Sequence, residues 1–416
     1  MVVRFASRLT TPLLVLALAA CQAPAGLSPA PDTVVTIGVD LPFGGMAQDV
    51  STDTWNAMRL YLEQVGGRAG RFRVELARYD NAPPPNSVWD DAECRRNANQ
   101  HLAVGHEVAV IGTYFSVCSK VQVPILNRAP GGPMLLVSHT DTNPGLTKAW
   151  EAGEPAAYFP SGRRSYARVM ATDDHQGTAA ARFAAQDLGV KRCFVLDDTE
   201  TYGVGVADAF VAEATRQGIQ VTGRGQWRRE AAGYRSLFGP ARTANVDCVF
   251  LGGIYDNHGD QLVKDKVAVL GSNDAVRLLA PDGFNGYPEL LTLAPARGAY
   301  VTEVGLSMAS VASRPGVPTQ FLADFRTRFN HDPSSVRVLY GVQALQVVLA
   351  AIERSDGTRA GVRDRVFEAP GISIAADRAI LGRSVTIAPT GDTDANDIMI
   401  EQIGPGEQVV VRALAI

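Results

Sequence analysis

The sequence predicts an α/β fold made of two doubly wound parallel-sheet lobes, and two observations predict it. Short apolar strands rich in β-branched residues, beginning with Val34–Val39, alternate with stretches of helical periodicity. This alternation is typical of parallel sheets covered by helices on both faces. The alternation then starts again near Gly177, and the two sets together span about 270 residues, more than one such domain usually contains.

The first set of elements opens the predicted fold. Trp55, Met58, Leu62 and Val65 lie at helical spacing, with Thr52 or Asp53 as a cap and a glycine pair as the stop. A second helix is expected over about 86–104. The strands expected in this set are Val34–Val39, Phe72–Leu76, Val108–Gly112 and Met134–Val137.

The second set repeats the pattern, and a third block follows it. Helices are expected over about 177–188 and 206–216, with strands at Cys193–Leu196, Ile219–Val221, Asp247–Leu251 and Arg277–Ala280. The third block contains a long helix over about 336–355. It ends in strands near Ser384–Ile387, Ile398–Gln402 and Gln408–Arg412.

The N-terminal residues 1–21 have the layout of a secretion signal. Arg4 and Arg8 give a positive start, Leu13–Leu18 is apolar, and small residues precede Cys21. The apolar run is shorter than the roughly 20 residues of a membrane-spanning helix. The pattern resembles a bacterial lipobox, which implies lipidation of Cys21; an ordinary signal peptide with an incidental cysteine is the alternative. Residues 22–33, rich in Ala, Pro and Gly, are expected to form a flexible tether.

This start predicts a protein of the cell envelope, on the periplasmic or extracytoplasmic face, anchored to a membrane through Cys21. Whether that membrane is an inner or an outer one stays open. The 416-residue chain has 43 acidic and 39 basic side chains, a net charge of −4. A mildly acidic protein without a basic run is not expected to bind nucleic acid.

The cysteines after position 21 are Cys94, Cys118, Cys193 and Cys248. An even number in an exported chain permits two disulfides, with three possible connectivities. We favour Cys94 with Cys118 and Cys193 with Cys248, because each pair falls within one predicted lobe; four separate buried thiols are the alternative. These spacings, and those of the six histidines, do not match a metal site, so we expect neither a metal nor a cofactor.

Polar residues follow the predicted strands, where parallel sheets place their ligands. In the first set these residues, such as Ser116 and Thr142, offer hydroxyls and the N–H groups of helix starts, which suit a carboxylate. In the second set Tyr202, Tyr255 and Asp282 follow strands and suit an ammonium group beside an apolar side chain. The sequence therefore predicts a cleft for a zwitterion.

At these positions the chain resembles the leucine/isoleucine/valine-type (branched-chain amino acid) substrate-binding proteins of ABC importers, with the type I periplasmic-binding fold. The resemblance covers nearly everything from Val34 to Ile416. Its most specific pieces are the Ile111-Gly112 strand end leading to Ser116, the run Ser138–Thr147, Asp173-x-x-Gln176-Gly177, Tyr202-Gly203 with Gly205, Gly252-Gly253-x-Tyr255 and Pro281-Asp282-Gly283.

The resemblance implies a role for each matching residue. Ser116 and Thr142 would hold the ligand carboxylate, and the backbone at Asp141 would accept from its ammonium group. Tyr202 and Tyr255 would pack on the ligand. Asp282 would pair with the ammonium group, and Asp173 and Gln176 would line the cleft mouth.

The resemblance also implies the organisation and the partners. A first lobe of residues 34–168 and 302–395 and a second lobe of residues 169–301 and 396–416 would close around the ligand like a hinge. The implied partners are a small-molecule ligand, an amino acid or an analogue, and ABC permease subunits, with the binding protein itself a monomer.

Four positions depart from the family pattern. Asp282 is one methylene shorter than the usual glutamate, and Asp141 stands where a small residue is common. Asp49 falls where an aromatic residue often packs on the ligand, and Val117 replaces a serine. If Asp141 enters the cleft, it disfavours a plain aliphatic ligand, so the ligand class is better defined than its identity.

Two other functions deserve comparison with solute transport. A hydrolase would use the nucleophile, base and acid types found at Ser116, Cys118, His139 and Asp141, but Ser116 lacks the GxSxG elbow, so an enzyme is not expected. A lipoprotein of the same fold could instead report its ligand to a receptor or kinase. The sequence does not separate this sensing function from transport.

Overall fold

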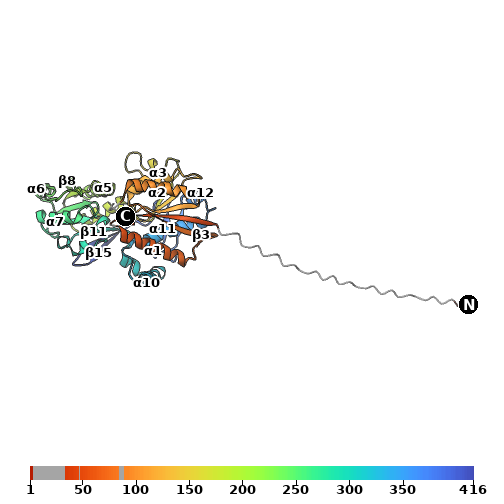
Figure 1. Cartoon of the computed structure of the whole chain (residues 1–416). Coiled ribbons are helices and arrows are strands. Elements are labelled where there is room, and N and C mark those ends of the chain that lie inside the picture. The colour runs from red at the N-terminus through yellow and green to blue at the C-terminus, as the bar shows by residue number, and fades with distance from the viewer. Residues whose placement is uncertain (3–32, 46, 84–88) are drawn as a thin grey trace. The chain divides into compact units, whose positions relative to one another are not determined.

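The computed structural model describes residues 1–2, 33–45, 47–83 and 89–416, and the fold is the compact unit Thr33–Ile416 (Figure 1). The predicted signal peptide, Cys21 and nearly all of the predicted tether lie outside the described residues. Among the residues that are described, no helix has both the length and the apolar character needed to cross a membrane.

The first sheet has the strand order β2-β3-β1-β4-β5-β6. Its strands are β1 (Val34–Leu41), β2 (Arg68–Ala69), β3 (Phe72–Asp80), β4 (Glu107–Gly112), β5 (Leu135–Ser138) and β6 (Tyr166–Arg168). Neighbouring strands run parallel, apart from the antiparallel pair β2–β3. The strand order reverses at β1, which lies between β3 and β4, so the carboxyl ends of these strands flank the crevice where ligands bind in such sheets.

Helices cover both faces of the first sheet, because side chains on a strand alternate between the faces. Ala109 and Ile111 of β4 belong to the core cluster that includes Met58 of α1, whereas Val110 packs in a separate cluster with Val123 of α3. Figure 1 shows α2 and α3 above these strands and α1 below. The helices of this part are α1 (Gln48–Gln64), α2 (Asp91–Ala103), α3 (Ser116–Leu126), α9 (Met308–Ala312), α10 (Val317–Phe329), α11 (Arg337–Glu353) and α12 (Arg359–Phe367).

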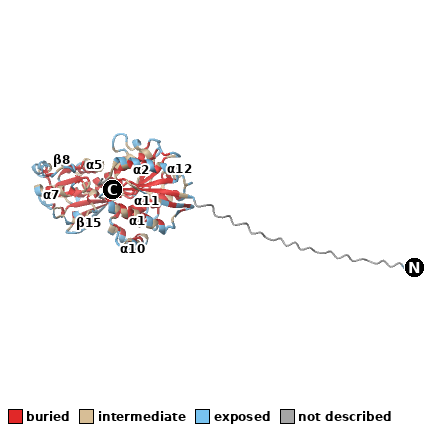
Figure 2. Cartoon of the chain, viewed as in Figure 1, coloured by how far each residue is buried: buried red, intermediate tan, exposed pale blue. Residues whose placement is uncertain are grey.

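The second sheet has the strand order β15-β14-β11-β10-β9-β7-β8. Its strands are β7 (Arg192–Asp197), β8 (Gln220–Gln226), β9 (Cys248–Gly252), β10 (Arg277–Ala280), β11 (Tyr300–Val304), β14 (Asp397–Ile403) and β15 (Gln408–Ala415). The helices with this sheet are α4 (Asp173–Gln186), α5 (Thr201–Arg216), α6 (Gly239–Thr243), α7 (Gly259–Leu270) and α8 (Pro288–Thr292). In Figure 2 the strands of both sheets are mostly buried.

The predicted α/β fold with two doubly wound sheets is confirmed, and the second sheet adds antiparallel strands at one edge. β14 pairs antiparallel with β11 and with β15. Residues 404–407 join β14 to β15 through a tight turn, in which the Gly404 N–H donates to the Glu407 carbonyl at 2.9 Å. A connection this short can only join antiparallel strands.

We call the first sheet with its helices the first lobe, and the second sheet with its helices the second lobe. Sheet membership places the change between lobes after β6, after β11 and before β14. The predicted first lobe began its second segment at residue 302. In the structure, Thr302–Val304 are instead part of β11 and belong to the second sheet. α1 begins at Gln48, earlier than the predicted cap, because Asp53 instead accepts a hydrogen bond from the Ser334 N–H at 2.8 Å.

The structure pairs the four described cysteines within the lobes. Cys94 of α2 is bonded to Cys118 of α3, and Cys193 of β7 is bonded to Cys248 of β9. These are the two pairs that the sequence favoured.

Candidate functional site

A cavity of about 800 Å³ lies at the carboxyl ends of strands from both sheets. Residues of both lobes line it, with Ser116 and Thr142 from the first lobe and Tyr202, Tyr255 and Asp282 from the second. The sequence placed these five residues after strands, and the structure brings all five to one cavity. Asp49 and Val117, two positions that depart from the family pattern, line it as well.

The first wall of the cavity comes from the first lobe and carries hydroxyl groups. Ser116 is the first residue of α3, where the leading N–H groups have no partner inside the helix and the helix dipole favours a negative charge. The Ser116 hydroxyl accepts from the Asn143 N–H at 3.3 Å, and the Thr140 hydroxyl donates to the Tyr114 carbonyl at 2.9 Å. Thr142 lies beside them. This wall can receive a carboxylate without a charged side chain.

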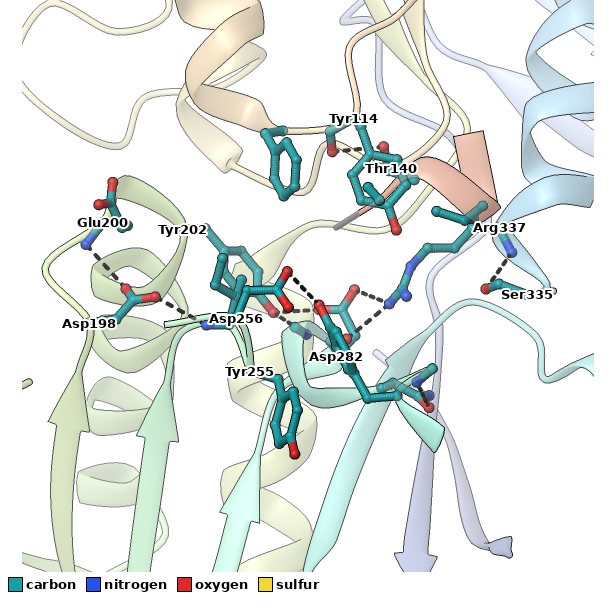
Figure 3. A pocket seen from close by; sticks show the side chains of 18 of the residues that line it. Tyr114, Thr140, Asp198, Glu200, Tyr202, Tyr255, Asp256, Asp282, Ser335 and Arg337 are labelled. Carbon is teal, nitrogen blue, oxygen red and sulfur yellow. Dashed lines mark hydrogen bonds and ion pairs between the residues drawn. The ribbon is translucent and has the colours of Figure 1, made fainter. Parts of the chain in front are cut away.

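The second wall comes from the second lobe, and Asp282 lies at its centre (Figure 3). Asp282 starts the short 3₁₀ helix Asp282–Phe284 after β10. Its Oδ1 accepts from Gln176 Nε2 at 2.7 Å and from the Tyr202 hydroxyl at 2.5 Å. Its Oδ2 accepts from Arg337 Nη2 at 2.9 Å. Three of its roughly four acceptor positions are therefore used within the protein.

Arg337 is the site residue that the sequence analysis missed. It begins α11, and its Nη2 lies 2.9 Å from Asp282 Oδ2 and 3.3 Å from Glu303 Oε1. Because α11 packs on α1 of the first lobe, the contact with Asp282 is an ion pair between the lobes. Burial, with Asp282 and Glu401 nearby, raises the pKa of Glu303 to about 8 despite Arg337, so Glu303 is largely protonated at neutral pH.

Aromatic side chains surround a second carboxylate of the second wall, Asp256. The rings of Tyr255 and Tyr287 lie 4.7 Å apart, and the Tyr287 hydroxyl donates to Asp256 Oδ2 at 2.9 Å. Asp256 Oδ1 has no hydrogen-bond partner among the described residues. Burial raises the pKa of Asp256 to about 6.

Asp141 differs from its expected role. Its side chain is buried away from the cavity lining, and Oδ2 accepts from the Tyr166 hydroxyl at 3.2 Å. Its backbone carbonyl accepts from Arg168 Nη1 at 3.1 Å and so is already engaged. The carboxylate does not enter the cavity in this structure, and the expected contact between the carbonyl and the ammonium group stays a prediction. Burial raises the pKa of Asp141 to about 6.

Asp173 and Gln176 do not line the mouth of the cleft, because both are fully buried. The Asp173 N–H donates to the Thr142 carbonyl at 2.9 Å and so ties α4 to the first wall. Burial raises the pKa of Asp173 well above its usual range. Gln176 acts through its hydrogen bond to Asp282. The motif placed both residues near the crossing between lobes, but sequence alone does not show burial.

The four residues that raised the hydrolase alternative do not form a catalytic arrangement. Cys118 is part of a disulfide, and Asp141 bonds to Tyr166. Neither ring nitrogen of His139 has a hydrogen-bond partner in the described part of the chain, and burial lowers its pKa to about 3. Ser116 therefore has no base oriented toward it.

The chain belongs to the periplasmic binding protein family, whose model matches residues 34–396. This is a family of solute-binding proteins and not of enzymes, and membership implies a location outside the cytoplasm. An amino acid binding protein of Pseudomonas aeruginosa is 26% identical over 228 residues, so that the alignment spans 54% of this chain and 55% of that protein. A leucine-, isoleucine-, valine-, threonine- and alanine-binding protein of the same species is 24% identical over 74% of this chain and 76% of its own length.

Solved structures share the fold. A leucine binding protein from Thermotoga maritima has a TM-score of 0.72 at 23% identity and covers 91% of this chain and 98% of its own. A solute-binding protein of an ABC transporter from Rhodopseudomonas palustris, solved with p-hydroxybenzoic acid, has a TM-score of 0.74 at 13% identity and covers 92% and 97%. At these identities the likeness establishes the type I periplasmic-binding fold, and the ligands that the two names state, leucine and p-hydroxybenzoic acid, differ in chemistry.

Proposed function

We propose that this protein captures an amino acid, or a molecule like one, in the cavity between its lobes and presents it to an ABC permease. The observation that carries the proposal is the pairing of unlike walls around one cavity. The first wall offers the start of α3 with the Ser116 hydroxyl, and the second wall offers Asp282 with its aromatic neighbours. A zwitterion has one charge for each wall.

In this proposal the ligand binds in two steps. Its carboxylate meets Ser116 and Thr142 of the first wall, and the second lobe then closes Tyr202 and Tyr255 over it. The ammonium group takes the acceptor position that remains at Asp282. Hinge closure of this kind is a common motion of two-lobed binding folds, and excluding water strengthens each polar contact.

The remaining parts of the proposal concern the partners. The relatives are named as amino acid binding proteins, and several structural neighbours are binding proteins of ABC transporters, which supports transport over sensing. We infer that the protein acts as a monomer, anchored through a lipid on Cys21 near its permease. Replacing Cys21 with serine tests the anchor: the variant should leave the membrane fraction, and a variant that still sediments with membranes contradicts the lipid tether.

Ligand binding can be tested by thermal unfolding of the full-length protein, followed by tryptophan fluorescence, with each of the common amino acids. A compound that binds only the folded state stabilises it by about 2.7 kcal/mol at one hundred times its dissociation constant. We expect a raised unfolding temperature with a selected group of amino acids. If no amino acid shifts the transition while p-hydroxybenzoate does, the zwitterion assignment is wrong and the cavity serves a simple carboxylate.

A further inference from the structure

We propose that the cavity takes a ligand with a positively charged side chain, in the class of the basic amino acids, and that Asp256 selects it. The inference rests on the proposed function, because it adds a third contact to an amino acid held by its carboxylate and ammonium groups. Its positively charged side chain distinguishes it from the ligands named for the relatives, whose side chains are uncharged.

Asp256 is the carboxylate of the second wall with an unused oxygen. It follows β9, lines the cavity, and accepts one hydrogen bond on Oδ2 from Tyr287. Its Oδ1 is buried without a hydrogen-bond partner among the described residues. Figure 3 shows it on the same wall as Asp282, with Tyr114 of the first wall above. A buried acceptor without a partner is costly, and a ligand cation that reaches it removes that cost.

Three other carboxylates of this wall already have partners, which distinguishes Asp256 from them. Asp282 is paired with Arg337, and Asp260 is paired with Lys264 at 2.7 Å. Asp198 accepts from the Ile254 N–H at 3.0 Å and from Asn257 Nδ2 at 2.9 Å. A ligand cation therefore gains more at Asp256 than at any of these three.

The charge around the cavity favours the same class of ligand. Among the described residues, the lining includes seven carboxylates and two cationic side chains, and those two cations, Arg337 and Lys264, are already in ion pairs. Arg229 acts on Asp256 and Glu200 from outside the lining and offsets part of this negative charge, and a neutral ligand adds nothing to that compensation. A ligand with an additional positive charge reduces this negative charge.

The aromatic rings near Asp256 suit a cation as well. The ring centroids of Tyr255 and Tyr287 lie 4.7 Å apart, and the Tyr287 hydroxyl donates a hydrogen bond to Asp256. Cations, above all planar guanidinium groups, bind favourably against such rings. The cavity volume of about 800 Å³ is also generous for an aliphatic amino acid and accommodates a long side chain.

The experiment compares ligands that differ in charge but hardly in shape. L-arginine is paired with L-citrulline, and L-lysine with L-norleucine, and each is titrated into the full-length protein by calorimetry. We expect at least one cationic member to bind roughly tenfold or more tightly than its neutral counterpart. Asp256→Asn, which keeps an acceptor for Tyr287, should reduce that preference to near one.

The matched control is Asp274→Asn. It removes the same charge from the second lobe, but its side chain is 87% exposed and lies outside the cavity lining. The preference for the cation should persist in this control, and thermal unfolding of both variants without ligand checks that they fold.

Each result decides between the two proposals. If the neutral members bind as tightly as the cationic ones, or if Asp256→Asn keeps the preference, the inference about Asp256 is overturned while amino acid binding stands. If none of the four compounds binds and leucine does, the ligand is aliphatic and only the cationic class fails. If no amino acid binds, the proposed function fails together with the inference.

Discussion

The two walls of the cavity are built on different principles. The first wall uses hydroxyls and the start of α3, all of which belong to the first lobe. The second wall uses carboxylates, and the charge of Asp282 is balanced by Arg337, which comes from the other lobe. The first wall is therefore complete in one lobe, whereas the electrostatics of the second wall depend on how closely the lobes approach.

This difference assigns the walls different tasks in closure. In the proposed opening of the lobes, Ser116 keeps its neighbour Asn143, whereas Asp282 loses Arg337 and presents an unbalanced negative charge. A ligand can thus settle on the first wall before the second is formed. In the proposed closure, Arg337 replaces water around Asp282.

We expect the largest effect on stability from removing the ion pair between Arg337 and Asp282 in the second wall. Arg337→Met removes the partner of Asp282 and leaves a buried carboxylate unpaired, which costs about 3–5 kcal/mol in the free energy of unfolding. Urea denaturation of the unliganded protein measures the loss. The double variant Arg337→Met with Asp282→Leu replaces both charges by apolar groups and should recover much of it. A single variant as stable as the native protein contradicts the importance of this pair.

The next effect sharpens the contrast, because substitutions in the first wall should affect ligand binding more than stability. Ser116→Ala removes a hydroxyl from the proposed carboxylate site and should cost about 1–3 kcal/mol of ligand binding, or about 5- to 150-fold in the dissociation constant. The unfolding transition should fall less than in Arg337→Met, because only the hydrogen bond from the Asn143 N–H is lost. Ser313→Ala, at an exposed position at the end of α9, serves as the control. Unaltered binding in Ser116→Ala rules out this hydroxyl as a ligand contact.

The smallest effect concerns pH, and the two walls should respond in opposite directions. Burial lowers the pKa of His139, beneath the first wall, from 6.5 to about 3, so the folded state resists protonation and stability falls as the pH drops below 6.5. The raised pKa of Glu303, about 8 against 4.5, means that the folded state holds this proton, so stability falls as the pH rises from 4.5 through 8.

Each group contributes a slope of at most about 1.4 kcal/mol per pH unit. His139→Leu should reduce the loss of stability that occurs as the pH drops below 6.5. Glu303→Gln should reduce the loss of stability that occurs as the pH rises from 4.5 through 8. Both expected changes can be checked by measuring the free energy of unfolding of each variant at intervals from about pH 4 to pH 9, roughly the span of the two transitions. Variants whose profiles run parallel to that of the native protein contradict the assignment.

The sequence predicted the cavity lining well where one rule applied. Ser116, Thr142, Tyr202, Tyr255 and Asp282 each follow a strand, and the carboxyl ends of parallel strands meet at one edge of a sheet. All five line the cavity. The strands themselves were found because buried parallel strands form nearly continuous apolar runs.

Arg337, which was missed, and Asp141, whose side-chain direction was left open, do not follow from that rule. Arg337 opens a helix far along the chain from Asp282, and only tertiary packing brings the two together. Asp141 lies in the correct loop, but whether its side chain turns toward the cavity or toward Tyr166 depends on the local backbone path. The strands β6 and β11 were not predicted, and the length of β11 does not explain this, because β5 and β10 are shorter and were predicted.

The position of the disulfides determines which parts of the protein are cross-linked. Within the described chain, Cys94–Cys118 closes a loop inside the first lobe and Cys193–Cys248 closes one inside the second, and neither crosses from one sheet to the other. Oxidation therefore stiffens each lobe and adds no covalent link between the two lobes. In an oxidising environment each lobe is cross-linked internally, and neither disulfide restrains the proposed motion of one lobe relative to the other.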